Sequence, residues 1–121
     1  MVMSDRTYQI RRKFPRKAFR RTLSFMVLGR SEVVEGVEIG EGGISFKTLS
    51  HIETDQKIIV NFFLVDGDFF CVRCTARNRQ EISGSFICGV SFDDVSVALK
   101  RQIRAYVARN VLNSNQKIEK D

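Results

Sequence analysis

The hydrophobic pattern of this chain changes its period near residue 95, and the change separates two kinds of structure. Before that point, apolar residues form short segments rich in Phe, Val and Ile, separated by turn signals that contain Gly or Asp. This pattern is typical of β-strands joined by tight turns. After it, apolar residues recur every four positions, at Leu99, Ile103, Val107 and Val111. That spacing is typical of one amphipathic helix, so the chain is predicted to be all-β with one C-terminal helix.

Six segments are predicted to be strands, and they cover residues 22–28, 33–39, 44–48, 57–65, 69–79 and 85–92. The first alternates roughly between apolar and polar residues, and the fourth is apolar enough to be buried along most of its length. The stretch from Gly40 to Gly43 (GEGG) separates the second segment from the third. We expect its glycines to supply the positive φ that a tight hairpin turn requires. A chain of 121 residues can bury one modest core. Six short strands and one helix therefore predict a small antiparallel barrel or sandwich.

The chain is expected to form a single domain over residues 11–112, between a flexible N-terminal tail (1–10) and a frayed C-terminal tail (113–121). Within the domain we expect a basic segment (11–21), the strands (22–92) and the helix (95–112), with Asp94 or Ser96 as its N-cap. No stretch approaches the roughly 18 apolar residues of a membrane span. Because the N-terminus also lacks the apolar core of a secretory signal, we expect a cytoplasmic protein.

The positive charge of the chain is concentrated between Arg11 and Arg21. Seven of these 11 residues are Lys or Arg, and none is acidic. The other 13 Lys and Arg residues are balanced by 14 Asp and Glu residues. Phe14, Pro15 and Phe19 interrupt the basic segment. An unbalanced, arginine-rich segment with aromatic residues is suited to an anionic partner that also offers a flat surface for stacking.

The sequence contains no set of residues that would assemble a catalytic or metal site. Cys71 and Cys74 form a CxxC pair, but positions three apart on a strand face opposite sides of the sheet. The single histidine, His51, is 20 residues away from Cys71. We therefore expect structural cysteines and no bound metal. Catalysis needs a nucleophile with its base, a paired acid and base, or a metal, so we expect the chain not to be an enzyme.

Taken together, the basic segment, the glycine turn and the ending, which is the stretch from Gly89 to Asp94 (GVSFDD) followed by the helix, resemble the PilZ domain family. The family's first motif, RxxxR, precedes its first strand, and the stretch from Arg12 to Arg16 (RKFPR) matches it, with Arg11 immediately ahead. The stretch from Arg16 to Arg20 is a second formal match, but the first places the glycine turn at the spacing usual in the family. Over residues 11–112, the resemblance implies a six-stranded antiparallel β-barrel with a terminal helix that binds the bacterial second messenger cyclic di-GMP.

The family's second motif, Asp/Asn-x-Ser-x-x-Gly, is altered in this chain. Here it is EIGEGG, so Glu38 replaces the shorter acid, Gly40 replaces the serine and Gly43 keeps the final glycine. The resemblance implies that the motif arginines clamp phosphates and guanine edges, that Glu38 accepts hydrogen bonds from guanine, and that the two glycines allow close approach. Glu41 adds a negative charge beside this anion site. The implied ligand-binding residues are Arg11, Arg12, Arg16, Glu38, Gly40 and Gly43.

Three functions remain open at this stage. The first is a stand-alone cyclic di-GMP receptor that acts on an unidentified protein partner in trans, for example in motility or biofilm regulation. The second is a degenerate PilZ adaptor that no longer binds cyclic di-GMP, which Glu38 and Gly40 suggest. The third is a small nucleic-acid-binding barrel, suggested by the sequence pI of about 9.6. The confinement of the charge to one segment, without an aromatic platform on successive strands, counts against nucleic acid.

Overall fold

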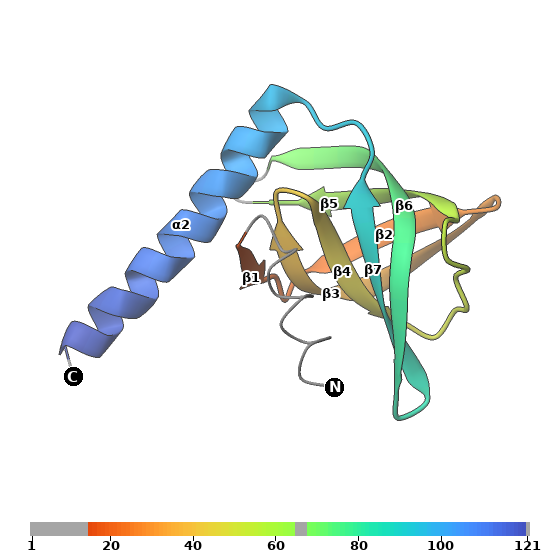
Figure 1. The fold of residues 1–121 in the computed structure, drawn as a ribbon, viewed down its shortest axis with the longest axis horizontal. Helices are drawn as coiled ribbons and strands as arrows, with labels where there is room; N and C mark the ends of the chain where they lie inside the picture. The colour runs from red at the N-terminus through yellow and green to blue at the C-terminus, as the bar shows by residue number, and fades with distance from the viewer. Residues whose placement is uncertain (1–14, 65–67, 121) are drawn as a thin grey trace, which may run out of the picture.

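A computed structural model describes residues 15–64 and 68–120, with side chains described as far as residue 109. Within these residues, seven strands precede one helix, labelled α2 (Figure 1). In chain order the elements are β1 (Arg16–Ala18), β2 (Thr22–Val27), β3 (Arg30–Gly40), β4 (Gly43–Thr48), β5 (Lys57–Phe63), β6 (Phe69–Ile82), β7 (Ser85–Phe92) and α2 (Val97–Lys120). The expected tail 1–10, Arg11 and Arg12 lie outside the described residues.

Strands β2 to β7 form a closed antiparallel barrel. Neighbouring strands are paired in the order β3-β2-β5-β6-β7-β4, and β4 pairs with β3 to close the ring (Figure 1). A closed ring leaves none of these six strands as a free sheet edge. The predicted fold class, a six-stranded antiparallel barrel with one C-terminal helix, is therefore confirmed.

The barrel core follows directly from the alternation in the sequence. Leu23, Phe25 and Val27 of β2 point inward and are buried, while their neighbours are partly or fully exposed. The rings of Phe25 and Phe46 stack inside the barrel with their centroids 4.9 Å apart. Phe19, which precedes β2, is fully buried and meets the ring of Phe62 edge-on at 5.8 Å. The end of the basic segment is thus anchored in the core.

Strand β1 is an element that the sequence pattern did not predict. Its three residues pair with the last part of β3, from Glu38 to Gly40. β2 pairs only with the first part of β3, from Arg30 to Glu35. Because β3 has 11 residues and β2 has six, the end of β3 would otherwise keep unpaired backbone groups on that side. β1 satisfies them, and it brings the end of the basic segment onto the barrel.

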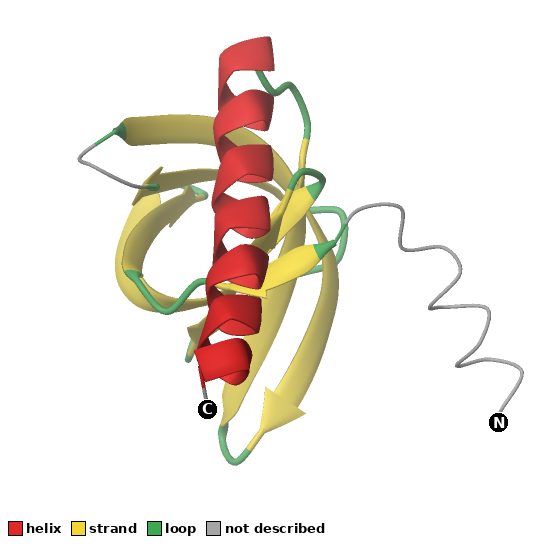
Figure 2. Cartoon of the chain, turned by 90° about the vertical axis from the view of Figure 1, so that its left-hand side faces the viewer, coloured by secondary structure: helices red, strands yellow, loops and turns green. Residues whose placement is uncertain are grey.

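Helix α2 begins after Ser96, whose Oγ accepts a hydrogen bond from the Leu99 amide at 3.1 Å, as expected of an N-cap. Leu99, Ile103 and Val107 are buried against the barrel, which confirms the predicted apolar stripe as far as side chains are described. Figure 2 shows α2 crossing in front of the barrel with β1 beside it. Within the described residues, no helix has the length and apolarity that crossing a membrane requires.

The helix continues to Lys120, although we expected it to end at residue 112 and the rest to fray. Residues 97–120 contain no Gly or Pro, so no residue in this stretch opposes helix propagation strongly. The loss of the apolar period beyond Val111, on which the predicted boundary rested, does not by itself stop a helix.

Candidate anion-binding site

The described parts of the RxxxR motif and of the altered second motif meet on the outer face of the barrel. Arg16 of β1 lies opposite Gly40 of β3, and Ala18 lies opposite Glu38. Because alternate residues of a strand share a face, Arg16, Glu38 and Gly40 are on one face, while Ile39 points into the core. Arg16 Nη1 is 3.8 Å from Glu38 Oε1, and the two side chains are 40% and 45% exposed. This distance makes an ion pair rather than a hydrogen bond, so both groups keep donors and acceptors available to a ligand.

Four of the six residues predicted for the ligand are therefore neighbours: Arg16, Glu38, Gly40 and Gly43. Gly43 lies opposite Gly40, at the other end of the two-residue turn. Arg11 and Arg12 lie outside the described residues, and their role stays a prediction. The backbone of Glu38 is held in place because its amide donates to Ser45 Oγ at 3.2 Å.

The glycines of this hairpin are needed for space rather than for positive φ, which corrects the expectation from the sequence. Among the described glycines, positive φ occurs at Gly29 and Gly84. A Cβ on Gly40 would lie 2.8 Å from the carbonyl oxygen of Pro15, and one on Gly43 would lie 2.1 Å from that of Val90. Atoms cannot approach so closely without a shift of the backbone. At these two glycines, backbone atoms of the chain itself therefore make the close approach that we expected of a ligand.

Helix α2 contributes two residues to this region that the sequence pattern did not single out. Arg104 Nε and Nη2 each donate to a carboxylate oxygen of Glu41 at 2.9 Å, so the pair is bidentate. The hydrogen bonds from Arg104 lower the pKa of Glu41, and attraction to Arg104 and Lys100 acts in the same direction. Tyr106 Oη donates to the carbonyl oxygen of Ala18 at 3.2 Å. One helix therefore contacts both the hairpin turn and β1.

These helix residues escaped prediction because they become neighbours only through tertiary folding. Arg104 and Glu41 are 63 residues apart, and Arg104 looks like any other cation on the polar side of an amphipathic helix. Glu41, which the sequence marks as an unfavourable charge, was the available signal. A carboxylate next to an anion site indicates that a cation elsewhere in the fold compensates its charge.

Arg77 brings another guanidinium toward the hairpin from β6. A β-bulge between Ala76 and Asn78 shifts the register there. Arg77 Nε donates to Ser91 Oγ at 2.9 Å, and Ser91 is the β7 residue paired with Gly43. Arg77 is also within 3.5 Å of a carboxylate oxygen of Asp55. Its charge is thus partly balanced within the fold.

The three cysteines differ in burial. Cys71 is exposed, whereas Cys74 and Cys88 are buried, and all three are free thiols. Burial raises the pKa of Cys74 to about 12 and that of Cys88 to about 11, so neither is a thiolate at neutral pH. Among the residues that the structure describes, no group of three or more His, Cys, Asp or Glu side chains is placed to hold a metal.

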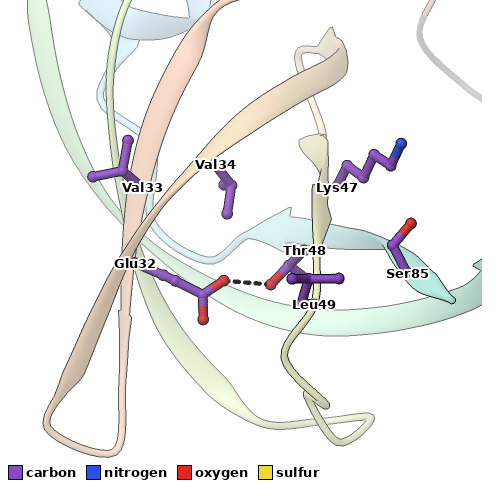
Figure 3. Close-up of a pocket in the computed structure, with 7 residues that line it drawn as sticks. All are labelled: Glu32, Val33, Val34, Lys47, Thr48, Leu49 and Ser85. Carbon is purple, nitrogen blue, oxygen red and sulfur yellow. Dashed lines mark hydrogen bonds between the residues drawn. The ribbon is translucent and has the colours of Figure 1, made fainter.

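A hollow of about 280 Å³ lies away from Arg16, at the end of the β3–β4 pair opposite the 40–43 turn (Figure 3). Glu32 lies at its edge and accepts a hydrogen bond from Thr48 Oγ1 at 2.6 Å and another from Ser50 Oγ. These bonds tie the beginning of β3 to the end of β4 and leave the carboxylate occupied. The lining residues are Glu32, Val33, Val34, Lys47, Thr48, Leu49 and Ser85.

Comparison with known proteins links this geometry to one family. The family model of the PilZ domain matches residues 10–109. Among solved structures, the chain is similar to the inhibitor of motility MotI/DgrA of Bacillus subtilis, with 14% identity, a TM-score of 0.74, and coverage of 85% of this chain and 52% of that one. It is also similar to YcgR of Escherichia coli in complex with c-di-GMP, with 16% identity, a TM-score of 0.72, and coverage of 91% and 50%.

A third similar structure is the PilZ domain of Escherichia coli YcgR with c-di-GMP, with 13% identity and a TM-score of 0.70. The match covers 92% of this chain and 99% of that one. The chain thus spans about half the length of MotI/DgrA and of full YcgR. At these identities the likeness is one of fold. A comparison with curated proteins gave no match.

Proposed function

Because the chain belongs to the PilZ domain family, we propose that it is a cyclic di-GMP receptor that signals through a ligand-dependent interaction with a protein partner. The observation that carries this proposal is the placement of Arg16 over Gly40 and beside Glu38 on one outer face of the barrel. PilZ domains are ligand-binding receptor domains, and in this proposal the ligand docks on this face.

The chemistry of these side chains fits the ligand. Cyclic di-GMP carries two phosphates and two guanines. An arginine fork can hold a phosphate, or the O6/N7 edge of a guanine, through two parallel hydrogen bonds. In this proposal Arg11, Arg12 and Arg16 supply those contacts. Glu38 then exchanges its 3.8 Å ion pair with Arg16 for hydrogen bonds from guanine N1–H and N2–H₂.

Signal transmission in this proposal starts at β1. The strand has three residues. Besides β3, it contacts α2, because Tyr106 Oη donates a hydrogen bond to the carbonyl oxygen of Ala18. In this proposal, the ligand binds the side chain of Arg16 and thereby acts on β1. Residues 5–20 then close over the nucleotide. This closure creates a new surface for the partner. The measurement is amide hydrogen exchange over residues 5–20, which should slow on addition of cyclic di-GMP; unchanged exchange would contradict closure.

Calorimetric titration of cyclic di-GMP tests the receptor role directly. Losing a charged hydrogen bond costs about 1.5–3 kcal/mol, so Arg16→Ala should weaken binding roughly ten- to a hundredfold. Arg12→Ala should do the same. Arg21→Ala is the matched control, because it removes the same charge from the same basic segment outside both RxxxR matches. If Arg21→Ala weakened binding as much as Arg16→Ala, the motif arginines would have no special role.

The second candidate is a PilZ adaptor that acts through protein partners without cyclic di-GMP. The observation that favours it is the contact of Gly40 with Pro15, which leaves no room for the motif serine. Glu38→Asp separates the two candidates, because it restores the family's acid without filling that space. Binding that appears only in Glu38→Asp would support the adaptor. Equal binding by the unaltered protein would support the receptor.

A further inference from the structure

Glu41 poses an electrostatic problem for an anion-binding site. It occupies the turn between Gly40 and Gly43, directly after the face that carries Arg16 and Glu38. A carboxylate at this point would repel the phosphates of any nucleotide. Its side chain is only 12% exposed, so water screens its charge less than it screens a surface carboxylate.

Arg104 compensates the charge of Glu41 through a bidentate contact. Two of its guanidinium nitrogens donate to the two carboxylate oxygens of Glu41, both at 2.9 Å. This fork geometry is the strongest form of an arginine–carboxylate pair. Because these hydrogen bonds lower the pKa of Glu41, the pair stays ionised at neutral pH. Seen from a ligand, the turn then presents a neutral pair instead of a negative charge.

The position of Arg104 is fixed by the helix that carries it. Ile103, its neighbour, is fully buried, and Leu99 and Val107 lie one turn to either side on the buried stripe. Tyr106 of the same helix is bonded to Ala18 on β1. Arg104 therefore acts from a packed element that also contacts the other half of the site, which limits how far the turn and β1 can separate.

We propose that Arg104 is a positioning residue of the candidate cyclic di-GMP site that acts through Glu41, because it neutralises this carboxylate beside the phosphates of the ligand. This proposal rests on the receptor function proposed above. It assigns the role to a residue outside both motifs, and it explains how the site tolerates an acid in its turn.

A double-mutant cycle in the full chain tests the proposal, with cyclic di-GMP titrated into each variant. Arg104→Gln should weaken binding about three- to tenfold, because it leaves Glu41 unpaired beside the phosphates. Glu41→Gln alone should bind at least as well as the unaltered protein. The double variant should return to the affinity of Glu41→Gln. Arg101→Gln is the matched control, since it removes one exposed cation from the same helix.

Two further readouts separate charge compensation from a merely structural role. The deficit of Arg104→Gln should shrink as salt is raised from about 0.05 to 0.5 M, because screening weakens the repulsion. Without ligand, the pKa of Glu41 followed by NMR should rise in Arg104→Gln. A double variant as weak as Arg104→Gln would overturn the proposal, as would an Arg104→Gln that binds normally. If the unaltered protein bound no cyclic di-GMP, the receptor function would fall as well, which distinguishes the two failures.

Discussion

Gly40 and Gly43 each make room for a carbonyl oxygen, but the two oxygens belong to different parts of the fold. The oxygen facing Gly43 is that of Val90, within barrel strand β7. The oxygen facing Gly40 is that of Pro15, which precedes β1 and lies outside the barrel. A side chain at position 43 would therefore act on the barrel itself, and one at position 40 on the docking of β1.

We expect Gly43→Ala to destabilise the fold by about 3 kcal/mol, because overpacking against a rigid strand forces the backbone to move. Urea unfolding measures the change. Gly29→Ala is the control: Gly29 has a φ of +76° and nothing near a new Cβ, so only backbone strain of about 1 kcal/mol should appear. Equal losses in both variants would show that contact with Val90 is unimportant.

The residues of the candidate site differ in how far the sequence could reveal them. Arg16, Glu38 and Gly40 stand in short motifs whose order fixes them on neighbouring segments, so their meeting could be predicted. The reason for the glycines could not, since it depends on which backbone approaches from another strand. The same holds for Arg104, because no local pattern says which helix cation will face Glu41.

At the scale of elements, short apolar segments between turn signals located the six barrel strands, because each strand has a buried face. It missed β1, whose burial is too slight to leave a pattern. β1 exists because β3 is longer than its partner β2. The end of α2 was also misplaced, since a helix can continue past its last apolar contact when Gly and Pro are absent.

The attachment of β1 to α2 can be tested through one hydroxyl group. Tyr106→Phe removes the hydrogen bond to Ala18 but keeps the ring, whose centroid lies 6.1 Å from that of Phe19. The variant should lose about 0.5–1.5 kcal/mol, the net contribution of one hydrogen bond, and this loss should destabilise the attachment of β1. Amide exchange at residues 16–18 should therefore quicken about two- to tenfold. Equal quickening in β5, on the far side of β2, would show a global effect instead.

At the scale of the whole molecule, a polar cluster attaches the barrel to the segment that leads into α2. Asp93 Oδ1 accepts from Thr75 Oγ1 at 2.7 Å, and Asp93 Oδ2 accepts from Lys57 Nζ at 3.3 Å. The backbone amide of Asp93 also donates to the carbonyl oxygen of Arg73 at 2.9 Å. The chain is thereby fixed on the barrel just before it turns into the helix.

This cluster should make the fold sensitive to acid. The Thr75 hydrogen bond, with help from Lys57, lowers the pKa of Asp93, and the Arg104 hydrogen bonds lower that of Glu41. A carboxyl group with a lowered folded-state pKa stabilises the fold at pH values above its unfolded-state pKa, which is about 4. This stabilisation is lost as the pH falls through the folded-state pKa. Urea midpoints between about pH 7 and 3 should show this decline. The double variant Asp93→Asn/Glu41→Gln should decline less steeply; an unchanged slope would contradict the assignment.

The contact of α2 with both β1 and the hairpin turn also has a consequence for the order of events during synthesis. A ribosome makes the chain from its N-terminus, and Tyr106 follows its partner Ala18 by 88 residues. When β7 has left the exit tunnel, every strand of the barrel is present, but Arg104 and Tyr106 are still enclosed. The nascent barrel therefore precedes the completed site. In the proposed receptor, the contacts of α2 with the turn and with β1 form only when the helix emerges and docks.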